Sequence, residues 1–403
     1  MDTPLDMFVA AELKRQNEGL ELIASENFTS KKIRELCGSV LTNKYAEGFP
    51  GKRYYGGCHI VDQVENLAIE KACELFGCRY ANVQPHSGSS ANMIAYAAVL
   101  KPGDKIMTLA LDEGGHLTHG SPVSFSGKYY QVVHYRLGKD GRIDYEAMRE
   151  LALSEKPQLI LAGFSAYPYT IDFSKFGNVA REIGAVFMVD IAHISGLVAT
   201  GAHPSPFPDA DIVTSTTHKT IRGPRGGLIL TNREDIFKKI NSATFPGMQG
   251  GPLMHIIAAK AQCFIEGLEP SFKQYIDQVL INTKACAQEM IKLGASVSDT
   301  DTHLFLVDTK ASFGMTGLDA QQKVEEIGIT INKNMIPGDQ EKPSVTSGVR
   351  IGLAATTTRG LTEDGARILG RLIFNYLSGK IDTETAHQET KKLVAMLKPV
   401  DQL

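Results

Sequence analysis

Two apolar runs in the chain end in residues that could do chemistry. Residues 186–189 are followed by Asp190, and residues 212–213 are followed by a Ser/Thr/His stretch that ends at Lys219. Each run predicts a buried strand, and ligands of open α/β sheets bind beyond the carboxyl ends of the strands. A lysine for a Schiff base and a carboxylate that keeps a pyridine nitrogen protonated are what pyridoxal phosphate chemistry requires. Taken alone, Asp190 could instead be a helix cap and Lys219 a solvated loop residue.

A third segment could bind an anion. Residues 87–90, Ser-Gly-Ser-Ser, come directly before an alanine-rich stretch at 91–100 that predicts a helix. The N–H groups at a helix N-terminus form a ready anion site. An ordinary serine N-cap is the simpler explanation in isolation. Together with Asp190 and Lys219, the segment indicates a site for the phosphate of the cofactor.

Three histidines could complete such a site. His116 and His119 have HxxH spacing but no cysteine or further ligand group nearby, so we expect no metal. A flat imidazole stacked on the pyridine ring is the alternative for His116. His193, three residues after Asp190, could reach the phenolic oxygen of the ring, or it could be a buried structural histidine.

Two further segments could bind a substrate. The glycine-rich segment 44–57 carries Glu47, a candidate general acid/base, among tyrosines that could donate hydrogen bonds; otherwise it is a cluster of turns. Arg350 and Arg359 are candidates to bind the carboxylate of an amino acid, because a planar guanidinium clamps a carboxylate with two hydrogen bonds. Arg350 lies within an apolar strand pattern, which favours a structural role for it.

The order of the elements predicts the fold class. From about residue 60 to 280, helical stretches alternate with short β-branched runs, which is typical of βαβ units and a largely parallel sheet. The runs are residues 105–109, 131–135, 159–162, 186–189, 212–214 and 227–230. A helical region at 252–293, interrupted at Pro270, is followed by a smaller α+β set. We expect an N-terminal helical arm at 1–25, a large cofactor-binding domain at 26–280 and a small C-terminal domain at 281–403.

The composition of the chain limits the kinds of partner and the compartment that we expect. The 403 residues carry a formal net charge of -3 and a pI near 6.4, which gives no reason to expect a nucleic acid or a membrane surface as partner. We find no apolar run of transmembrane length and no signal-peptide pattern, so we expect a cytoplasmic protein. The six cysteines form no CxxC pair and are expected to be free thiols in a reducing compartment.

Taken together, these segments resemble the serine hydroxymethyltransferase family, within the fold-type I, aminotransferase-like superfamily. The similar segments are residues 22–27, 44–48, 53–58, 86–89, 114–120, 190–193, 216–227, 245–247 and 249–254. The resemblance implies a mostly parallel central sheet in a large α/β domain, with a smaller α+β C-terminal domain. It also implies reversible transfer of the serine hydroxymethyl group to tetrahydrofolate, giving glycine and 5,10-methylenetetrahydrofolate through a pyridoxal-phosphate aldimine.

The resemblance further implies roles for single residues. Lys219 is the implied Schiff-base lysine, Asp190 the partner of the pyridinium and His116 the stacking residue. The other implied cofactor contacts are Ser87, Gly88, Ser89, Ser165, His193, His218 and Gly250. Substrate contacts are Ser25, Tyr45, Glu47, Tyr55 and Arg359, of which Glu47 and Tyr55 are also catalytic and Arg359 holds the carboxylate. Folate contacts are Leu111, Gly115, His116, Leu117, Lys342, Pro343 and Ser344. The implied unit is a homodimer in which Glu47, Tyr55 and Gly250 serve the site of the neighbouring subunit.

The chain departs from the family pattern at two places. Leu353 and Ala354 stand where the family commonly has Thr-Pro, and Gly338 stands where it often has Phe. Both departures leave the fine substrate preference open. A folate-independent β-hydroxy amino acid aldolase or an α-methylserine hydroxymethyltransferase is therefore an alternative. A cofactor-bound protein without turnover is another, against which the presence of Lys219, Asp190, Glu47 and Arg359 argues.

Overall fold

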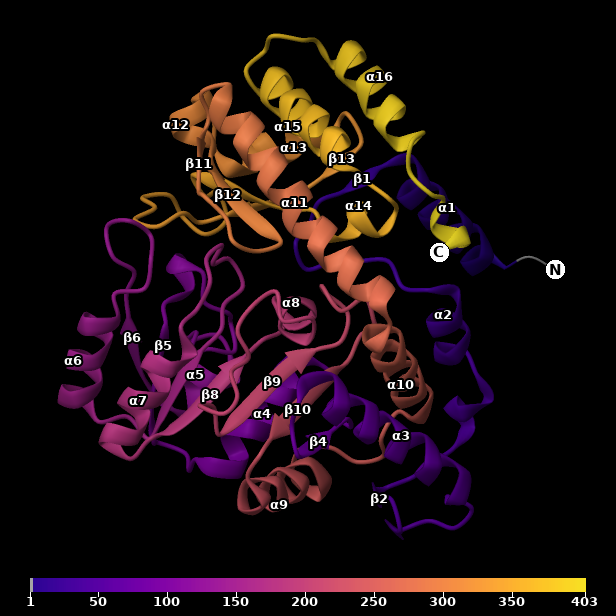
Figure 1. Cartoon of the computed structure of the whole chain (residues 1–403), viewed down its shortest axis with the longest axis vertical. Coiled ribbons are helices and arrows are strands. Elements are labelled where there is room, and N and C mark those ends of the chain that lie inside the picture. Colours follow the sequence, from indigo (N-terminus) through magenta and orange to yellow (C-terminus); the bar gives the residue numbers. More distant parts are fainter. Residues whose placement is uncertain (1–2) are drawn as a thin grey trace. The chain divides into compact units, whose positions relative to one another are not determined.

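The computed structural model describes residues 3–403, which divide into two compact units (Figure 1). One unit comprises residues 32–165 and 170–273. The other comprises the N-terminal residues to Lys31, residues 166–169 and residues 274–403. The N-terminal arm thus groups with the C-terminal part of the chain, because β1 (Leu20–Glu21) pairs in parallel with β13 (Ile329–Thr330). The boundary expected at 280 falls inside the helix α11 (Pro270–Lys292).

The larger unit is built on a seven-stranded sheet, which confirms the predicted α/β class. Across the sheet the strands are β4 (Tyr80–Asn82), β10 (Gly227–Thr231), β9 (Ile212–Thr216), β8 (Val186–Asp190), β7 (Leu159–Ala162), β5 (Lys105–Leu109) and β6 (Gln131–Tyr135). The five strands from β9 to β6 run parallel, and β10 is antiparallel to both of its neighbours. The sequence predicted six of these strands and missed the short β4.

The helices of the larger unit include several that pack on this sheet. They are α2 (Lys31–Cys37), α3 (His59–Phe76), α4 (Gly88–Val99), α5 (Phe125–Tyr129), α6 (Tyr145–Glu155), α7 (Phe173–Ile183), α8 (Ser195–Ala199), α9 (Glu234–Ser242) and α10 (Met254–Leu268). Helix α4 packs on β9 and β10, and its Ala91, Ile94 and Ala95 lie in a buried cluster with strand residues. Because α4 follows β4 in the chain, its N-terminus lies on the side of the sheet where β4 ends.

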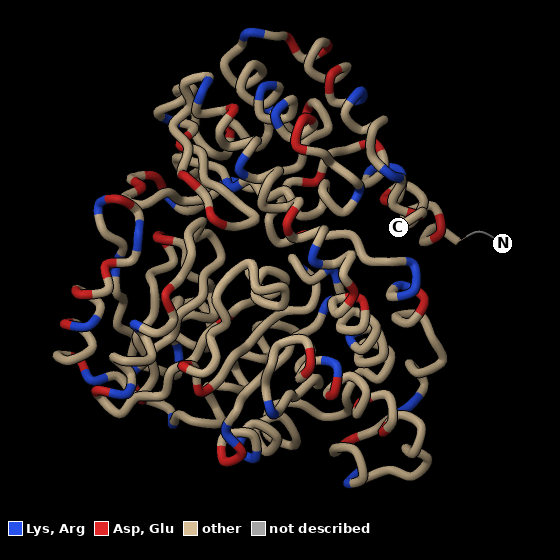
Figure 2. The backbone as a smooth tube through the Cα atoms, viewed as in Figure 1, with Lys and Arg blue, Asp and Glu red and all other residues tan. Residues whose placement is uncertain are grey.

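Charge is distributed unevenly in this unit. Charged residues lie mostly on helices and loops (Figure 2), and the seven strands contain only Lys105 and Asp190. Lys105 begins β5 and forms an ion pair with Glu155 at 2.8 Å, where both side chains are partly exposed. Asp190 is buried. A buried charge is costly unless it is paired and hydrogen-bonded, so Asp190 needs a specific explanation.

The second unit carries a smaller antiparallel sheet, as predicted for the C-terminal part. Its strands are, in order, β11 (Ser296–Val297), β12 (Leu304–Asp308), β15 (Gly348–Gly352) and β14 (Asn332–Asn334). Its helices are α1 (Pro4–Glu18), most of α11, α12 (Thr309–Phe313), α13 (Gly317–Glu325), α14 (Ala354–Thr358), α15 (Glu363–Leu377) and α16 (Thr383–Val394). One buried cluster joins these elements, with Phe305, Ile351 and Leu369 among its members. No helix among residues 3–403 is long and apolar enough to cross a membrane.

Candidate active site

Asp190 ends β8, and three hydrogen bonds compensate its burial. The backbone N–H of Ala192 donates to Oδ1 at 2.9 Å, and the amide of Asn92 donates to Oδ2 at 2.9 Å. Nε2 of His119 lies 3.0 Å from the same Oδ2. Burial by itself would raise the pKa of Asp190, but hydrogen bonds from His119 and Asn92 and the Coulombic interaction with His119 hold that pKa below its ordinary value. Asp190 is therefore a buried carboxylate that stays ionised.

The residues around Asp190 form one polar network. Nδ2 of Asn92 also donates to Oγ1 of Thr118 at 2.8 Å, and that hydroxyl lies 2.7 Å from Nδ1 of His116. The rings of His116 and His119 lie 5.4 Å apart, edge to face. The His116 ring, which the sequence predicted to stack on the cofactor, is thus connected to Asp190 through Thr118 and Asn92. The sequence analysis missed the part played by Asn92, Thr118 and His119.

Lys219 lies in the turn after β9, the strand next to that of Asp190. In the β8–β9 pair Asp190 is opposite Thr214, and Lys219 follows three residues after the end of β9. The turn that carries Lys219 is held to the segment after β8, because Oγ1 of Thr220 donates to the carbonyl of His193 at 3.0 Å. The side chain of Lys219 is buried, with 8% of its surface exposed. The predicted acid and lysine therefore lie beyond the ends of neighbouring parallel strands.

The N-terminus of α4 has the form of an anion site. Ser87 caps the helix by accepting a hydrogen bond from the backbone N–H of Ser90 at 3.1 Å. A Cβ atom at Gly88 would lie 2.6 Å from Cγ2 of Thr216, so this position packs tightly against the end of β9. The first N–H groups of the helix have no partner within the helix and point outward. These N–H groups are available to an anion, and the phosphate role of Ser87, Gly88 and Ser89 stays a prediction.

The remaining cofactor residues predicted in this unit lie on the loops that follow the strands. Ser165 follows β7, and its N–H donates to the carbonyl of Gly114 in the His116 loop at 2.8 Å. His193 is buried in the turn after Asp190. Among the described residues, Nδ1 of His218 is one of the few buried side-chain atoms without a hydrogen-bond partner, so a polar group can be accommodated there. Burial, with the charges of Arg225 and Lys219, lowers the pKa of His218 to about 3.

Glu47 is partly exposed and belongs to a separate cluster of surface residues in the same unit. The hydroxyl of Tyr45 donates to Oε1 of Glu47 at 3.1 Å, and the rings of Tyr45 and Tyr55 lie 5.0 Å apart. A Cβ atom at Gly250 would lie 3.3 Å from Oε1 of Glu47. Four residues that the resemblance assigns to substrate or cofactor contacts, among them the three placed across a subunit boundary, are thus neighbours within one chain.

Arg359 does not have the placement expected of a substrate-binding residue. It is the largest side chain in the described structure with less than 2% of its surface exposed. Its guanidinium donates to the carbonyls of Lys398, Gln16, Gly19 and Asn17 at 2.9 to 3.1 Å. Four of its five N–H groups are therefore used by the backbone. Only one N–H group remains for a carboxylate, which would need two for a bidentate contact. The prediction that Arg359 binds the substrate carboxylate is therefore corrected.

Arg350 lies on β15 and has a different environment. Its side chain is buried, and Nε donates to Oδ1 of Asn332 at 3.2 Å. Two residues further on, the N–H of Gly352 donates to the carbonyl of Leu22 at 2.8 Å, and a Cβ atom at Gly352 would lie 2.5 Å from Cα of Ala24. The predicted substrate residue Ser25 follows Ala24 in the chain. The structure therefore brings Ser25 close to the strand of Arg350.

The predicted folate residues lie in both units. In the larger unit Leu111 and Leu117 have 41% and 49% of their surfaces exposed, so both could contact a ligand. Gly115 lies between them, where a Cβ atom would meet the carbonyl of Leu109 at 2.5 Å. Lys342, Pro343 and Ser344 form an exposed loop in the other unit. Their folate role stays a prediction.

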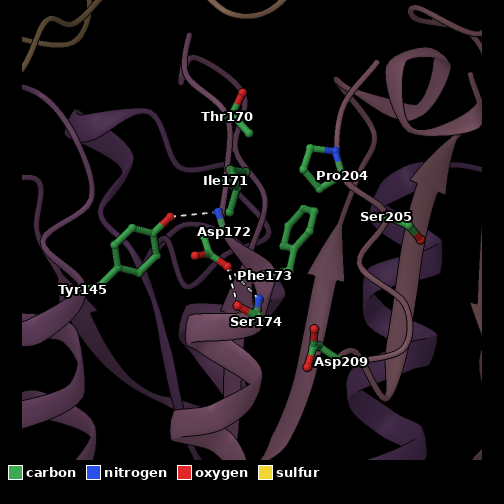
Figure 3. Close-up of a pocket in the computed structure, with 9 residues that line it drawn as sticks. All are labelled: Tyr145, Thr170, Ile171, Asp172, Phe173, Ser174, Pro204, Ser205 and Asp209. Carbon is green, nitrogen blue, oxygen red and sulfur yellow. Dashed lines mark hydrogen bonds between the residues drawn. The ribbon is translucent and has the colours of Figure 1, made fainter. Parts of the chain in front are cut away.

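A pocket of about 490 Å³ in the larger unit lies apart from these residues (Figure 3). Asp172, which lines it, caps α7 by accepting from the N–H of Ser174 at 3.1 Å, and its own N–H donates to the hydroxyl of Tyr145 at 2.9 Å. None of the predicted site residues lines the pocket. Among residues 3–403 no group of three His, Cys, Asp or Glu side chains is arranged to hold a metal ion.

The fold and the site define a class of protein. An open α/β sheet with a buried carboxylate and a buried lysine beyond adjacent strand ends, next to a helix N-terminus, is the arrangement of a fold-type I pyridoxal-phosphate enzyme. The family model for serine hydroxymethyltransferase matches residues 1–373. The chain belongs to the serine hydroxymethyltransferase family. It is a transferase of one-carbon metabolism that interconverts serine and glycine, with pyridoxal phosphate as cofactor and tetrahydrofolate as co-substrate.

Individual relatives support this assignment over almost the whole length. Serine hydroxymethyltransferase of Lactobacillus gasseri is 55% identical over 390 residues, which are 95% of this chain and 95% of that protein. The protein of the same name from Lactobacillus johnsonii is 56% identical over 373 residues, 92% of this chain and 90% of the relative. That from Rippkaea orientalis is 54% identical over 389 residues, with coverage of 96% and 91%.

Proposed function

We propose that helix α4 positions both ends of the cofactor in this enzyme. Asp190 accepts a hydrogen bond from Asn92, which lies on the same helix as Gly88 and Ser89. Asn92 follows Gly88 by four residues, a rise of about 6 Å along the helix axis. One helix thus carries both the N-terminal N–H groups that could receive a phosphate and the amide that holds Asp190. This observation supports the assignment of Ser87 to Ser89 to the phosphate and of Asp190 to the ring nitrogen.

The residues then divide the chemistry among them. When bound, pyridoxal phosphate supplies an electron sink for bond cleavage at the α carbon of the substrate. Asp190, held anionic, keeps a proton on the ring nitrogen. The amine of Lys219 would be the group that holds the cofactor covalently. His116, His193 and Ser165 would help to hold the ring of the cofactor.

We assign the substrate carboxylate to Arg350 in place of Arg359. Arg350 shares its unit with Ser25, and β15 adjoins the Ala24 segment. A buried guanidinium binds a carboxylate strongly because both charges are poorly screened there. Glu47 takes the proton of the serine hydroxyl when the hydroxymethyl group leaves, and the tetrahydrofolate nitrogen accepts the one-carbon unit.

We further propose a cytoplasmic homodimer with shared sites. Tyr45, Tyr54 and Tyr55 have 53%, 75% and 47% of their surfaces exposed, and exposed tyrosines beside a functional acid are typical of protein interfaces. Each chain would supply the Glu47 cluster to the site built by Lys219 and Asp190 of its partner. A monomer would then lack its proton-transfer acid. The six cysteines are free thiols, as is usual in a reducing compartment.

Mixing two inactive variants tests the shared site. One variant carries Lys219→Ala and the other Glu47→Gln, and both are dissociated and reassociated together. A dimer with one subunit of each variant contains one site in which both Lys219 and Glu47 are intact. We therefore expect recovery of serine turnover in the presence of tetrahydrofolate. Each variant reassociated with itself is the control. Hybrids proven by mass spectrometry that stay inactive would place Glu47 and Lys219 in the same subunit's site.

A further inference from the structure

Lys260 is a buried lysine that the mechanism above does not use. It lies on α10, and 1% of its surface is exposed. Its ammonium donates to three backbone carbonyls, those of Val83 at 2.7 Å, Pro85 at 2.9 Å and Gly227 at 2.7 Å. An ammonium has three N–H donors, so all of them are used by the main chain. No carboxylate accepts from Lys260 in these hydrogen bonds, which is unusual for a buried cation.

The three carbonyls belong to the backbone directly behind the phosphate segment. Val83 and Pro85 lie between β4 and Ser87, and Gly227 begins β10. The N–H of Gly227 donates to the carbonyl of Pro85 at 3.0 Å. A Cβ atom at Gly227 would lie 2.2 Å from the carbonyl oxygen of Ser87, so these two residues touch. Lys260 therefore fixes the two strand ends on which the Ser87 turn rests.

The phosphate segment itself carries no formal positive charge. Residues 84–92 contain neither lysine nor arginine. Hydroxyls, backbone N–H groups and a helix dipole worth roughly half a charge are what the segment offers to an anion. A phosphate monoester carries about 1.5 to 2 negative charges at neutral pH. Transfer of such an anion from water into a partly buried site is costly without a balancing cation.

The charge of Lys260 acts on His86, next to the phosphate turn, and on His218, next to Lys219. After burial, Lys260 is the next cause that lowers the pKa of His86, the residue before the phosphate segment. It also contributes to the lowered pKa of His218, after burial and the charges of Arg225 and Lys219. Burial lowers the pKa of Lys260 to about 7, against the opposing effect of Glu65 on α3. A nearby dianion would favour the charged ammonium.

We propose that Lys260 positions the turn that binds the cofactor phosphate and balances the phosphate charge from behind that turn. Its effect passes through the backbone of Pro85 and Gly227, so Lys260 is a positioning residue without direct contact to the cofactor. The inference rests on the proposed phosphate site at Ser87 to Ser89. It predicts that the contribution of Lys260 to cofactor binding depends on the phosphate group.

The test compares two ligands on the apoprotein, pyridoxal phosphate and pyridoxal, which lacks the phosphate. Lys260→Met should weaken binding of pyridoxal phosphate by about tenfold or more, and that of pyridoxal by a much smaller factor, because a unit charge acts on the dianion. Lys260→Arg, which keeps the charge, should retain most of the preference for the phosphorylated ligand. Lys238→Met, which alters an exposed lysine of α9, is the matched control and should change neither affinity. If Lys260→Met does not fold, Lys260→Gln carries the same comparison, since it keeps an N–H donor and removes the charge.

Ser87→Ala in the same assay separates the inference from its premise. A Ser87 variant that loses phosphate preference, beside a Lys260→Met variant that weakens both ligands equally, would overturn the role of Lys260 and leave the phosphate site in place. If neither variant affects the preference for the phosphorylated ligand, the phosphate site itself is misplaced. Loss of preference in both variants supports the proposal.

Discussion

Replacement of Arg359 by alanine should damage the fold and leave the binding of serine largely unchanged. The guanidinium joins the end of α1 to the C-terminal segment through carbonyls of Gln16, Asn17, Gly19 and Lys398. All of these residues belong to the same unit. The side chain also lies over the ring of Phe28, with Cζ 5.9 Å from the ring centroid. Removing it opens a cavity and strips four carbonyls of their donor.

The size of the effect follows from these contacts. A hydrogen bond from a charged group contributes about 1.5 to 3 kcal/mol, and each buried acceptor left without a donor costs about 1 to 3 kcal/mol. Gln16, Asn17 and Gly19 are only partly buried, so water can satisfy some of the carbonyls. We therefore expect a loss for each carbonyl near the lower end of that range. A total loss of about 3 kcal/mol should lower the thermal midpoint of unfolding by roughly 3 to 4 °C, because the unfolding entropy of a 403-residue chain is large.

The assay pairs thermal unfolding with serine affinity for Arg359→Ala and for Arg350→Ala. Arg350→Ala should weaken serine binding by about 1.5 to 3 kcal/mol, roughly ten- to 150-fold, with a smaller change in the unfolding midpoint. Arg350→Lys, which keeps the charge and loses the planar fork, should lie between wild type and alanine. Normal stability of Arg359→Ala combined with a large loss of serine affinity would refute the reasoning and restore Arg359 as the carboxylate residue.

Three further outcomes are expected. Lys219→Ala should lack both turnover and the visible absorption of a cofactor joined to the protein, and persistence of that absorption would show that another amine forms the bond. Glu47→Gln should lose about 10² to 10⁴ in serine turnover, as is usual for a positioned acid/base, while a near-normal rate would assign the proton to another group. Burial and the charge of Glu26 raise the pKa of Glu21 to about 8, so its stabilisation is present below its unfolded pKa and is lost as pH rises through about 8. Glu21→Gln should therefore become more stable relative to wild type between pH 5 and 9 in denaturant titrations, and an unchanged difference would contradict this.

The sequence predicted the strands and the residues at their ends because those signals are local. The apolar runs before Asp190 and Lys219 correspond to β8 and β9. A parallel sheet then places the ends of neighbouring strands at one edge, so the two residues lie near each other. Pro270 separated two helices as predicted, since α10 ends at Leu268 and α11 begins at Pro270.

The choice between the two arginines could not be made locally. Arg350 lies in a strand and Arg359 follows a threonine-rich helix, and a strand pattern favours a structural role for its residues. The structure gives Arg359 a structural role, because its guanidinium bonds with carbonyls more than 300 residues away in α1 and its C-cap. Contacts at such separations leave no periodic signal in the sequence. A similar limit applies to Asn92 and His119, which meet Asp190 only in the folded sheet.

The segment that carries Glu47 is fixed by buried charges within its own chain. The guanidinium of Arg53 donates to the carbonyls of Ala46 and Gly48, each at 2.9 Å, on either side of Glu47. The same guanidinium pairs with buried Glu65 at 2.6 Å.

The network continues toward the cofactor side of the same subunit. Gln84 donates to Oε1 of Glu65 at 2.8 Å and to the carbonyl of Gly48 at 2.9 Å, and it stands three residues before Ser87. One polar core therefore shapes both the acid segment and the approach to the phosphate turn. In a shared-site dimer these two segments would serve different active sites. Each chain would then arrive with both half-sites already formed, and assembly would need docking of rigid surfaces without refolding of either loop.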